Sequence, residues 1–367
     1  MERREVISNF QLMSLIVIST IGTSSLYAPA TLVRYAERNS WFLVLAGGLA
    51  GLLNLAILMA LNRMYPDKNL IRICKHVLGP WIGGLLAFAV IFYFIDVTAW
   101  IVREFAQFFI VALSPVVPQS WYLATGIIMG AYAVYRGLEA FSRVSEIVLF
   151  VIVFTFLGIY TVLSWQYHPE YLLPVLENGL LAPLSGIIPV ASWLGDLMFI
   201  SMMLNHVRRT KKTAAYAVGA VAVTTVLLML SVLSCTLLFG AKASESFTYP
   251  SISLIQNIRL FRHIERFDAA LVAVWVMSCF IKLTVYLWSA QQGLADLLKL
   301  KKPRMFLIPV AAGIYVCAKF KVWGLIELGR FYDQQAWYFC LFQYAVPGFL
   351  LLVAWLRGDG GKSKVGA

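Results

Sequence analysis

Charged residues are scarce in this sequence. Of its 367 residues, only 13% are Asp, Glu, Lys or Arg, whereas 60% are hydrophobic. The mean hydropathy is +0.79. A soluble domain cannot cover so much apolar surface with so little charge, so we expect the lipid bilayer to be the solvent. A large soluble domain, a low-complexity tract and a long linker are also missing, and we therefore interpret residues 1–367 as a single transmembrane domain.

Motifs that hold metals or carry out covalent catalysis are absent as well. The five cysteines stand singly, without a CxxC pair, and the four histidines form no HExxH motif. We expect the cysteines to be small packing residues, and we expect neither a metal site nor a cofactor. Because no pairing of a nucleophile with a base stands out, we do not expect an enzyme.

The net charge of +12 could indicate a nucleic-acid partner, but the distribution of the basic residues argues against one. Lys and Arg fall mainly in short gaps between apolar segments, which is typical of membrane topology. One set of segment ends carries roughly twice as many of them as the other. The positive-inside rule therefore places both termini in the cytoplasm, in contact with membrane lipids but with no nucleic acid.

Ten apolar segments approach the length of about 20 residues that a membrane helix needs. The first is longer than the ~7–15 residues of a signal-peptide core, so we expect it to be a membrane helix. The ninth segment is short and spans only if Lys319 and Lys321 snorkel outward. The ten segments are 10–33, 40–62, 81–112, 120–136, 144–163, 184–204, 214–239, 267–294, 305–318 and 333–356.

Residues 251–267 form an eleventh pattern, outside the ten segments. Apolar residues recur there every three positions from Ile252 to Phe267, while Arg259, Arg262 and Arg266 share another face. This pattern predicts an amphipathic helix on the outer membrane interface. The helix is either a lid or a tethered surface helix.

The first apolar segment contains residues that weaken a helix. Gly22 lowers helix propensity, and Pro29 cannot donate a backbone N–H to the carbonyl of Ser25. The hydroxyls of Thr23, Ser24 and Ser25 can bond the backbone groups left open. We interpret this stretch as a discontinuity facing a polar cavity. The alternative is that Gly22 allows close helix packing and Pro29 only kinks the helix.

The sixth segment repeats the pattern with Gly186, Pro189 and Gly195, followed by Asp196. Interrupted segments at corresponding places in two halves are typical of a transporter-type binding site. They lead two five-helix halves, 10–163 and 184–356. With an odd number of spans in each half, the second must be inverted. We therefore predict an all-α integral membrane protein with ten transmembrane helices in a 5+5 inverted repeat, helices 1 and 6 being discontinuous. The opened backbone would hold a small zwitterion.

Ionisable residues at membrane depth are costly and indicate function. Asp96 and Arg103 share a helix face with backbones about 10 Å apart, and Glu104 follows. They form either a gating network or a packing pair. Asp196 either binds an ammonium group or a proton, or caps the second half-helix. Lys282 either fills the place of a coupling sodium ion in related folds or pairs with Asp96 or Asp196.

Several short motifs, spread over nearly the whole chain, carry a family resemblance. The chain resembles the B subunits of bacterial spore nutrient germinant receptors, a branch of the amino acid–polyamine–organocation (APC) superfamily. The motifs are Ile7–Gln11, Ile21–Thr23 with Pro29, Arg103–Phe105, Pro174–Gly179, Tyr249–Leu254 and Ile264–Asp268 with Val274–Trp275.

The resemblance implies the LeuT-like inverted-repeat fold and the inner membrane of the spore, with both termini on the core side. It also implies a complex with an A subunit and a lipoprotein C subunit. The germinant, commonly an amino acid, would bind beside the first and sixth helices. By position, the pocket would include Gly22, Thr23, Tyr93, Trp193 and Leu194; Ser24 and Ser25 join it from the interrupted stretch.

Two functions fit these expectations. The first is a germinant-binding receptor subunit on a transporter scaffold. The alternative is a proton-coupled amino acid permease, with Asp96, Asp196 or Glu104 carrying the proton. Both need the same cavity, so a flux measurement, rather than the sequence, separates them.

Overall fold

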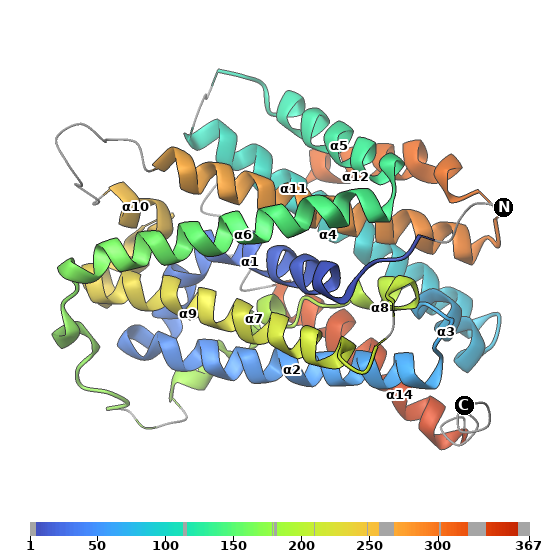
Figure 1. Ribbon diagram of the computed structural model, residues 1–367, viewed down its shortest axis with the longest axis horizontal. Helices are drawn as coiled ribbons and strands as arrows, with labels where there is room; N and C mark the ends of the chain where they lie inside the picture. The colour runs from blue at the N-terminus through green and yellow to red at the C-terminus, as the bar shows by residue number, and fades with distance from the viewer. Residues whose placement is uncertain are drawn as a thin grey trace.

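A computed structural model of the chain shows an all-helical bundle (Figure 1). It describes residues 5–112, 116–177, 179, 182–208, 210–247, 249–256, 268–300, 302–321 and 335–358. The helices of the first half of the chain are α1 (Asn9–Ala36), α2 (Ser40–Met64), α3 (Leu70–Leu78), α4 (Ile82–Ala112), α5 (Gln119–Arg136) and α6 (Leu138–Leu163).

The second half begins with two short helices, α7 (Ile187–Leu194) and α8 (Ile200–Met203). Three further long helices and one short one follow: α9 (Thr213–Ser246), α10 (Pro250–Gln256), α11 (Asp268–Leu297) and α12 (Leu307–Phe320). A last helical stretch, Gln335–Leu356, contains a π-helical turn at Leu341–Ala345 and ends as α14 (Val346–Leu356).

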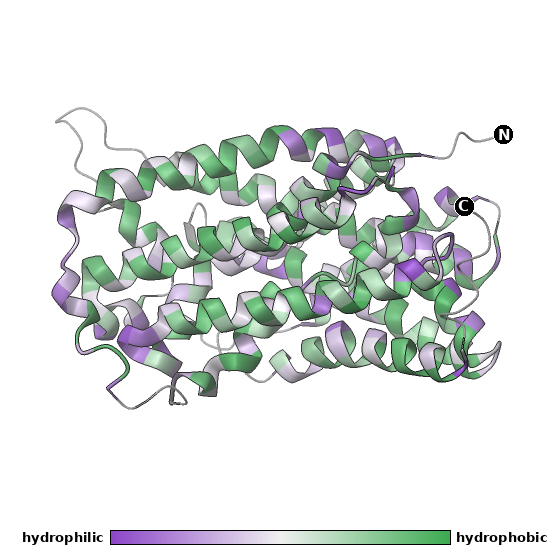
Figure 2. Cartoon of the chain, turned by 60° about the horizontal axis from the view of Figure 1, so that its bottom comes forward, coloured by the Kyte–Doolittle hydropathy of each residue, from purple (hydrophilic) through white to green (hydrophobic). Residues whose placement is uncertain are grey.

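The protein is an integral membrane protein. Over the described residues, seven helical stretches are long and apolar enough to cross a membrane: Asn9–Met64, Ile82–Val111, Leu138–Gln166, Thr213–Ser246, Leu271–Leu297, Pro303–Phe320 and Gln335–Leu356. The first contains both α1 and α2. Large apolar side chains such as Phe154 and Ile308 are 72% and 80% exposed, as expected where lipid covers the surface. Figure 2 shows hydrophobic residues along the helices and hydrophilic residues toward the two ends of the bundle.

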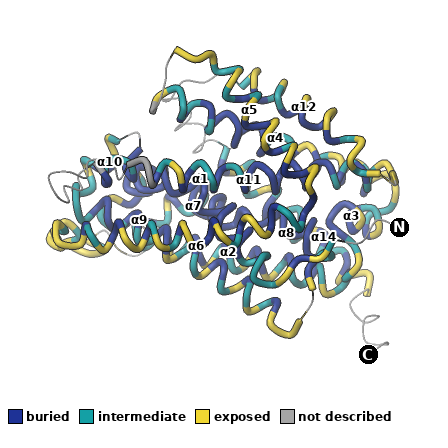
Figure 3. Tube along the Cα trace, turned by 45° about the horizontal axis from the view of Figure 1, so that its top comes forward, coloured by how far each residue is buried: buried dark blue, intermediate teal, exposed yellow. Residues whose placement is uncertain are grey.

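Helix α1 lies at the centre of the bundle. It packs against α9, α11 and α6, and nearly all of its residues from Leu12 to Val33 are buried. Figure 3 shows this buried centre, with exposed positions on the outer faces of α4, α5 and α12. From Asn9 to Val33 the helix has no charged residue, so none of its faces has to reach water, which suits this central position.

The predicted discontinuity of the first span is wrong: α1 is one helix from Asn9 to Ala36, with Pro29 inside it. The carbonyl of Ser25, which loses its partner to Pro29, instead accepts a hydrogen bond of 2.6 Å from the Ser251 hydroxyl on α10. Gly22 serves close packing, since a Cβ there would lie 2.9 Å from the Cβ of Ser278 on α11. One replaced bond is enough to keep the helix intact.

The sixth segment does leave the helical path. α7 ends at Leu194, and α8 begins only at Ile200. The intervening carbonyl of Gly195 accepts a bond of 2.6 Å from the side-chain amide of Asn54 on α2. The Tyr344 hydroxyl donates to the carbonyl of Ala191 at 2.9 Å. We call residues 195–199 the α7–α8 break.

Residues 5–8, which we call the N-terminal strap, join separate parts of the chain at one end of the bundle. Ile7 forms a parallel β-bridge with Val207, and Ser8 caps α1 in a capping box with Gln11. The Glu5 carboxylate accepts from the backbone N–H of Leu138 at 2.9 Å. The strap therefore fixes the start of α1 to the start of α6 and to the segment after α8.

The amphipathic helix expected over 251–267 is described only at its start. α10 covers Pro250–Gln256 and packs against α1, α9 and α11. Ser251, Leu254 and Ile255 are buried there, so this part lies within the bundle rather than on its surface. Residues 257–267 lie outside the described part of the chain.

Candidate functional site

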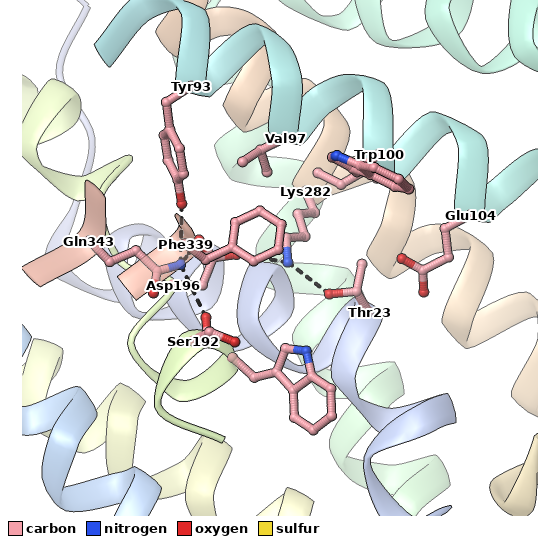
Figure 4. Close-up of a pocket in the computed structure, with 12 residues that line it drawn as sticks. Thr23, Tyr93, Val97, Trp100, Glu104, Ser192, Asp196, Lys282, Phe339 and Gln343 are labelled. Atoms are coloured by element: carbon pink, nitrogen blue, oxygen red, sulfur yellow. Dashed lines mark hydrogen bonds and ion pairs between the residues drawn. The ribbon is translucent and has the colours of Figure 1, made fainter. Parts of the chain in front are cut away.

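A small cavity lies in the middle of the bundle, next to the α7–α8 break (Figure 4). We call it the central cavity. Its volume is about 40 Å³, which holds a few water molecules at most. Its lining residues come from α1, α4, α7 and the break, α11 and the last helical stretch. They are Thr23, Tyr93, Val97, Trp100, Ile101, Glu104, Ser192, Trp193, Asp196, Lys282, Phe339 and Gln343.

The ammonium group of Lys282 connects three elements at this cavity. It donates to the Thr23 hydroxyl of α1 at 2.7 Å and forms an ion pair of 2.8 Å with Asp196 in the break. The two charged side chains are only 7% and 8% exposed. Of the predicted alternatives for Lys282, the structure therefore shows the buried pair with Asp196.

The other oxygen of Asp196, Oδ1, accepts from two neutral side chains. The Tyr286 hydroxyl of α11 donates to it, as does the side-chain amide of Gln343 at 3.2 Å. The cap residue of α8 is Phe199, and no side chain bonds there. Asp196 therefore does not cap the second half-helix, one of the two roles predicted for it; it is the anion of a buried network.

One face of α4 forms a long wall of the central cavity. Tyr93, Val97, Trp100, Ile101 and Glu104 follow each other at spacings of three and four, or one residue beside the other, and such positions share a helix face. Tyr93 anchors this wall, since its hydroxyl accepts from Gln343 at 3.2 Å. Glu104 is 1% exposed and lies three turns further along.

The predicted ligand-binding residues divide into two groups. Thr23, Tyr93 and Trp193 line the central cavity. Gly22, Ser24, Ser25 and Leu194 are not among the lining residues.

Each residue of the second group has another contact. The Ser24 hydroxyl bonds the carbonyl of Thr20 within α1 at 2.8 Å. Leu194 lies against α2, where a Cβ on Gly51 would come within 2.5 Å of its carbonyl oxygen. The uninterrupted winding of α1 explains why Thr23 lines the cavity while Gly22, Ser24 and Ser25 do not, because the helix turns only one face toward the cavity.

The predicted charge network divides in a similar way. Lys282, Asp196 and Glu104 line the cavity, whereas Asp96 forms an ion pair of 2.7 Å with Lys321 at the end of α12. The Lys321 ammonium also lies 4.0 Å from the ring centre of Trp100, behind the cavity wall. Lys321 therefore turns to Asp96 instead of snorkelling outward.

Arg103 lies away from the central cavity. Its guanidinium donates to the side-chain carbonyl of Gln119 on α5. Within the described residues, no group of three or more His, Cys, Asp or Glu side chains could hold a metal ion.

Sequence reasoning missed several residues of the site. Asn54 and Gln343 are fully buried amides, and Tyr286 is a buried hydroxyl donor. The signal was available for the first two, since a polar amide inside an apolar segment is costly unless it is bonded. Trp100 and Phe339 gave no signal, because aromatic residues are frequent throughout this chain.

Comparison with known proteins gives a consistent result. Residues 6–321 match the family profile described as "Spore germination protein". Spore germination protein KB of Bacillus subtilis (strain 168) is 27% identical and covers 98% of this chain and 97% of its own length. Spore germination protein YndE of the same organism is 24% identical, over 97% of this chain and 98% of that protein.

Two solved structures share the fold. MhsT in complex with L-phenylalanine aligns with a TM-score of 0.68 and 12% identity, covering 98% of this chain and 92% of that one. The second structure is that of Mhp1, a nucleobase-cation-symport-1 family transporter in a closed conformation with bromovinylhydantoin bound. It aligns with a TM-score of 0.65 and 10% identity, covering 97% of this chain and 80% of that one. At these identities the likeness shows the fold alone, which is that of LeuT-type transporters.

Proposed function

The chain belongs to the spore germination protein family, and we propose that it is the germinant-binding transmembrane subunit of a spore germination receptor. Its ligand is a small nutrient, an amino acid, bound in the central cavity. The membrane is the inner membrane of the spore, with both termini on the core side. The partners are an A subunit and a lipoprotein C subunit, as the family resemblance implies.

The observation that carries this proposal is the charged lining of the central cavity. Lys282, Asp196 and Glu104 all face the central cavity beside the α7–α8 break, and all three residues are buried. Ionisable groups inside a bundle of membrane helices are costly to bury. Their usual role is to bind a polar ligand or to move an ion. The irregular backbone at the break is tolerated where it faces such a cavity.

We further propose the 5+5 inverted repeat for the arrangement of the spans. The first repeat is α1, α2, α4, α5 and α6, and the second is α7–α8, α9, α11, α12 and the last helical stretch. Two short helices support this pairing, because α3 follows the second member of the first repeat and α10 follows that of the second. They lie at opposite ends of the bundle, as inversion requires (Figures 1 and 3).

The size of the cavity indicates how binding would become a signal. A volume of about 40 Å³ is too small for an amino acid, so the lining side chains must separate before the ligand fits. Thr23 and Asp196 both bond Lys282, so this separation moves α1, α11 and the break relative to each other. A ligand that binds only the expanded cavity shifts the population toward it, and the partner subunits would respond to that shift.

The second candidate is a proton-coupled amino acid permease. One observation favours it: Tyr286, Asp196, Lys282 and Thr23 form a continuous hydrogen-bonded chain across the site. Such chains of ionisable groups are typical of proton relays in transporters. One of the two solved structures of the same fold, that of Mhp1, is also a transporter structure.

A reconstitution experiment tests both. The purified protein is placed in liposomes, and binding of the 20 L-amino acids is measured by thermal stabilisation alongside uptake under a pH gradient. Binding without accumulation supports the receptor subunit, and accumulation driven by the gradient supports the permease. If no amino acid stabilises or crosses, both assignments fail.

A further inference from the structure

The unbroken path of α1 removes the groups that were expected to hold a carboxylate. An interrupted first span would present free N–H groups of a helix end to the ligand. In the structure α1 continues through Gly22, Thr23 and Ser24, so these N–H groups lie within the helix. From α1, the central cavity therefore receives the side chain of Thr23.

Lys282 supplies a positive charge in place of those N–H groups. An ammonium group has three N–H donors, and its contacts with Thr23 and Asp196 use two of them. Because Lys282 lines the central cavity, its third donor is available to a ligand there. A carboxylate held by this donor would gain a charge-assisted hydrogen bond to a buried ammonium group.

Glu104 supplies a negative charge further along the same cavity. Its side chain belongs to the lining and is 1% exposed. Figure 4 shows Lys282 and Thr23 drawn between Asp196 and Glu104. A carboxylate offers about four acceptor positions, so Glu104 can accept N–H groups of a ligand in addition to its contacts within the protein.

The remaining walls are apolar or aromatic. Trp100, Trp193 and Phe339 lie around the charged groups, and Val97 and Ile101 complete the α4 wall. Aromatic faces attract ammonium groups as well as apolar side chains. The cavity thus combines one positive group, one separate negative group and apolar walls.

We propose that Glu104 selects ligands that carry an amine, and that the ligand is a zwitterionic amino acid with an apolar side chain, held by two protein side chains. Its ammonium group binds Glu104, its carboxylate binds Lys282, and its side chain lies against the tryptophans. This inference rests on the proposed function and deepens it. Recognition by side chains replaces recognition by the backbone of α1.

The test compares an amino acid with analogues that lack one of its charged groups. The probes are L-phenylalanine, 3-phenylpropionate and phenethylamine, and L-valine, 3-methylbutanoate and isobutylamine. Affinities are taken from thermal stabilisation of the purified full-length protein. Wild type should bind at least one of the two amino acids about 10- to 100-fold more tightly than its analogue without the amine, the range for losing a bond to a charged group.

The variant Glu104→Gln should lose most of this preference. The affinity for the amino acid falls about 10- to 100-fold, while the affinity for the carboxylic acid without an amine stays the same or rises. Glu104→Asp, which keeps the charge, should restore part of the preference. Glu146→Gln on α6, outside the cavity lining, is the matched control and should leave the preference unchanged.

Two results would overturn the inference without touching the proposed function. One is an equal loss of affinity for both compounds in Glu104→Gln, which would make Glu104 a structural residue. The other is a wild type that binds the carboxylic acid as tightly as the amino acid. If only amino acids with polar or charged side chains stabilise wild type, the apolar side chain is the part that fails. If none does, the proposed function fails as well.

Discussion

Helix α1 and the α7–α8 segment both contain proline and glycine, but only the α7–α8 segment leaves the helical path. In α1, Pro29 removes a single bond, and Ser251 replaces it at the carbonyl of Ser25. In α7, Pro189 lies in the first turn, where its missing N–H has no helical partner in any case. The break begins six residues later, at Gly195. The position of the proline therefore does not decide where the chain leaves the helix.

The difference lies in the neighbouring helices. Three side-chain donors from elsewhere serve the carbonyls at the end of α7: Asn54 bonds Gly195, Tyr344 bonds Ala191 and Gln343 bonds Ser192. In α1, a side-chain donor replaces the lost backbone N–H at a single carbonyl, that of Ser25. In the membrane each unpaired backbone group is costly, so a helix opens where several external donors converge.

Removing Lys282 should have the largest effect, because this residue joins α1 to the break. In Lys282→Met the carboxylate of Asp196 stays buried without its ion-pair partner. We expect a loss of about 3–5 kcal/mol in the free energy of unfolding, measured by denaturant unfolding in detergent micelles. Lys321→Met is the matched control. Its pair with Asp96 is 16% exposed on each side, so the loss should be smaller. Equal losses of stability in the two variants would contradict the role of Lys282 in joining α1 to the α7–α8 break.

Asn54→Leu removes one of the three donors at the break while keeping the side-chain volume. The carbonyl of Gly195 then has no amide to bond, and we expect a loss of about 1–3 kcal/mol. The neighbouring variant Leu53→Ala, at a position 60% exposed on the outer face of α2, should change stability by about 0.5 kcal/mol or less. If both variants behave alike in denaturant unfolding, external donors do not hold the break.

Gly22→Ala tests the close packing of α1. The new methyl group would lie 2.9 Å from the Cβ of Ser278, so the helices must shift. We expect a loss of at least about 1 kcal/mol. Gly219→Ala on α9 meets nothing within 4 Å and should be neutral or stabilising, since alanine favours a helix over glycine by about 1 kcal/mol. A gain at Gly22 would show that α1 and α11 are looser than described.

The smallest effect concerns the replaced bond itself. Ser251→Ala should lose about 0.5–1.5 kcal/mol in the free energy of unfolding, because the carbonyl of Ser25 loses its closer donor and keeps only the Ser231 hydroxyl at 3.5 Å. In a Pro29→Ala background the loss should shrink, since residue 29 then supplies its own N–H. A double-mutant cycle of these two substitutions measures the coupling. Additive effects would show that Ser251 does not replace the bond lost to Pro29.

Local patterns in the sequence predicted the helical membrane fold and part of the site. Long apolar segments indicated the spans, and the cost of burying Lys282 and Asp196 made their pairing one of the alternatives. Tyr93, Thr23 and Trp193 were placed at the pocket through the family resemblance. These predictions needed no knowledge of the partners that each helix meets.

The rest depended on contacts between residues far apart in the chain. The hydroxyl that bonds the open carbonyl of Ser25 in α1 belongs to Ser251, 226 positions later. Asn54 lies 141 positions from Gly195. A single sequence gives the polar residues in each segment but not the helix they face. The same holds for Lys321, whose partner Asp96 is 225 positions away.

The N-terminal strap has a consequence for the order of assembly. Ile7 is synthesised about 200 residues before its partner Val207. At a translation rate of about 5–20 residues per second, the bridge between them can form only after roughly 10–40 s. Helices α1 to α8 are therefore all synthesised before the strap can join the start of α1 to the segment after α8.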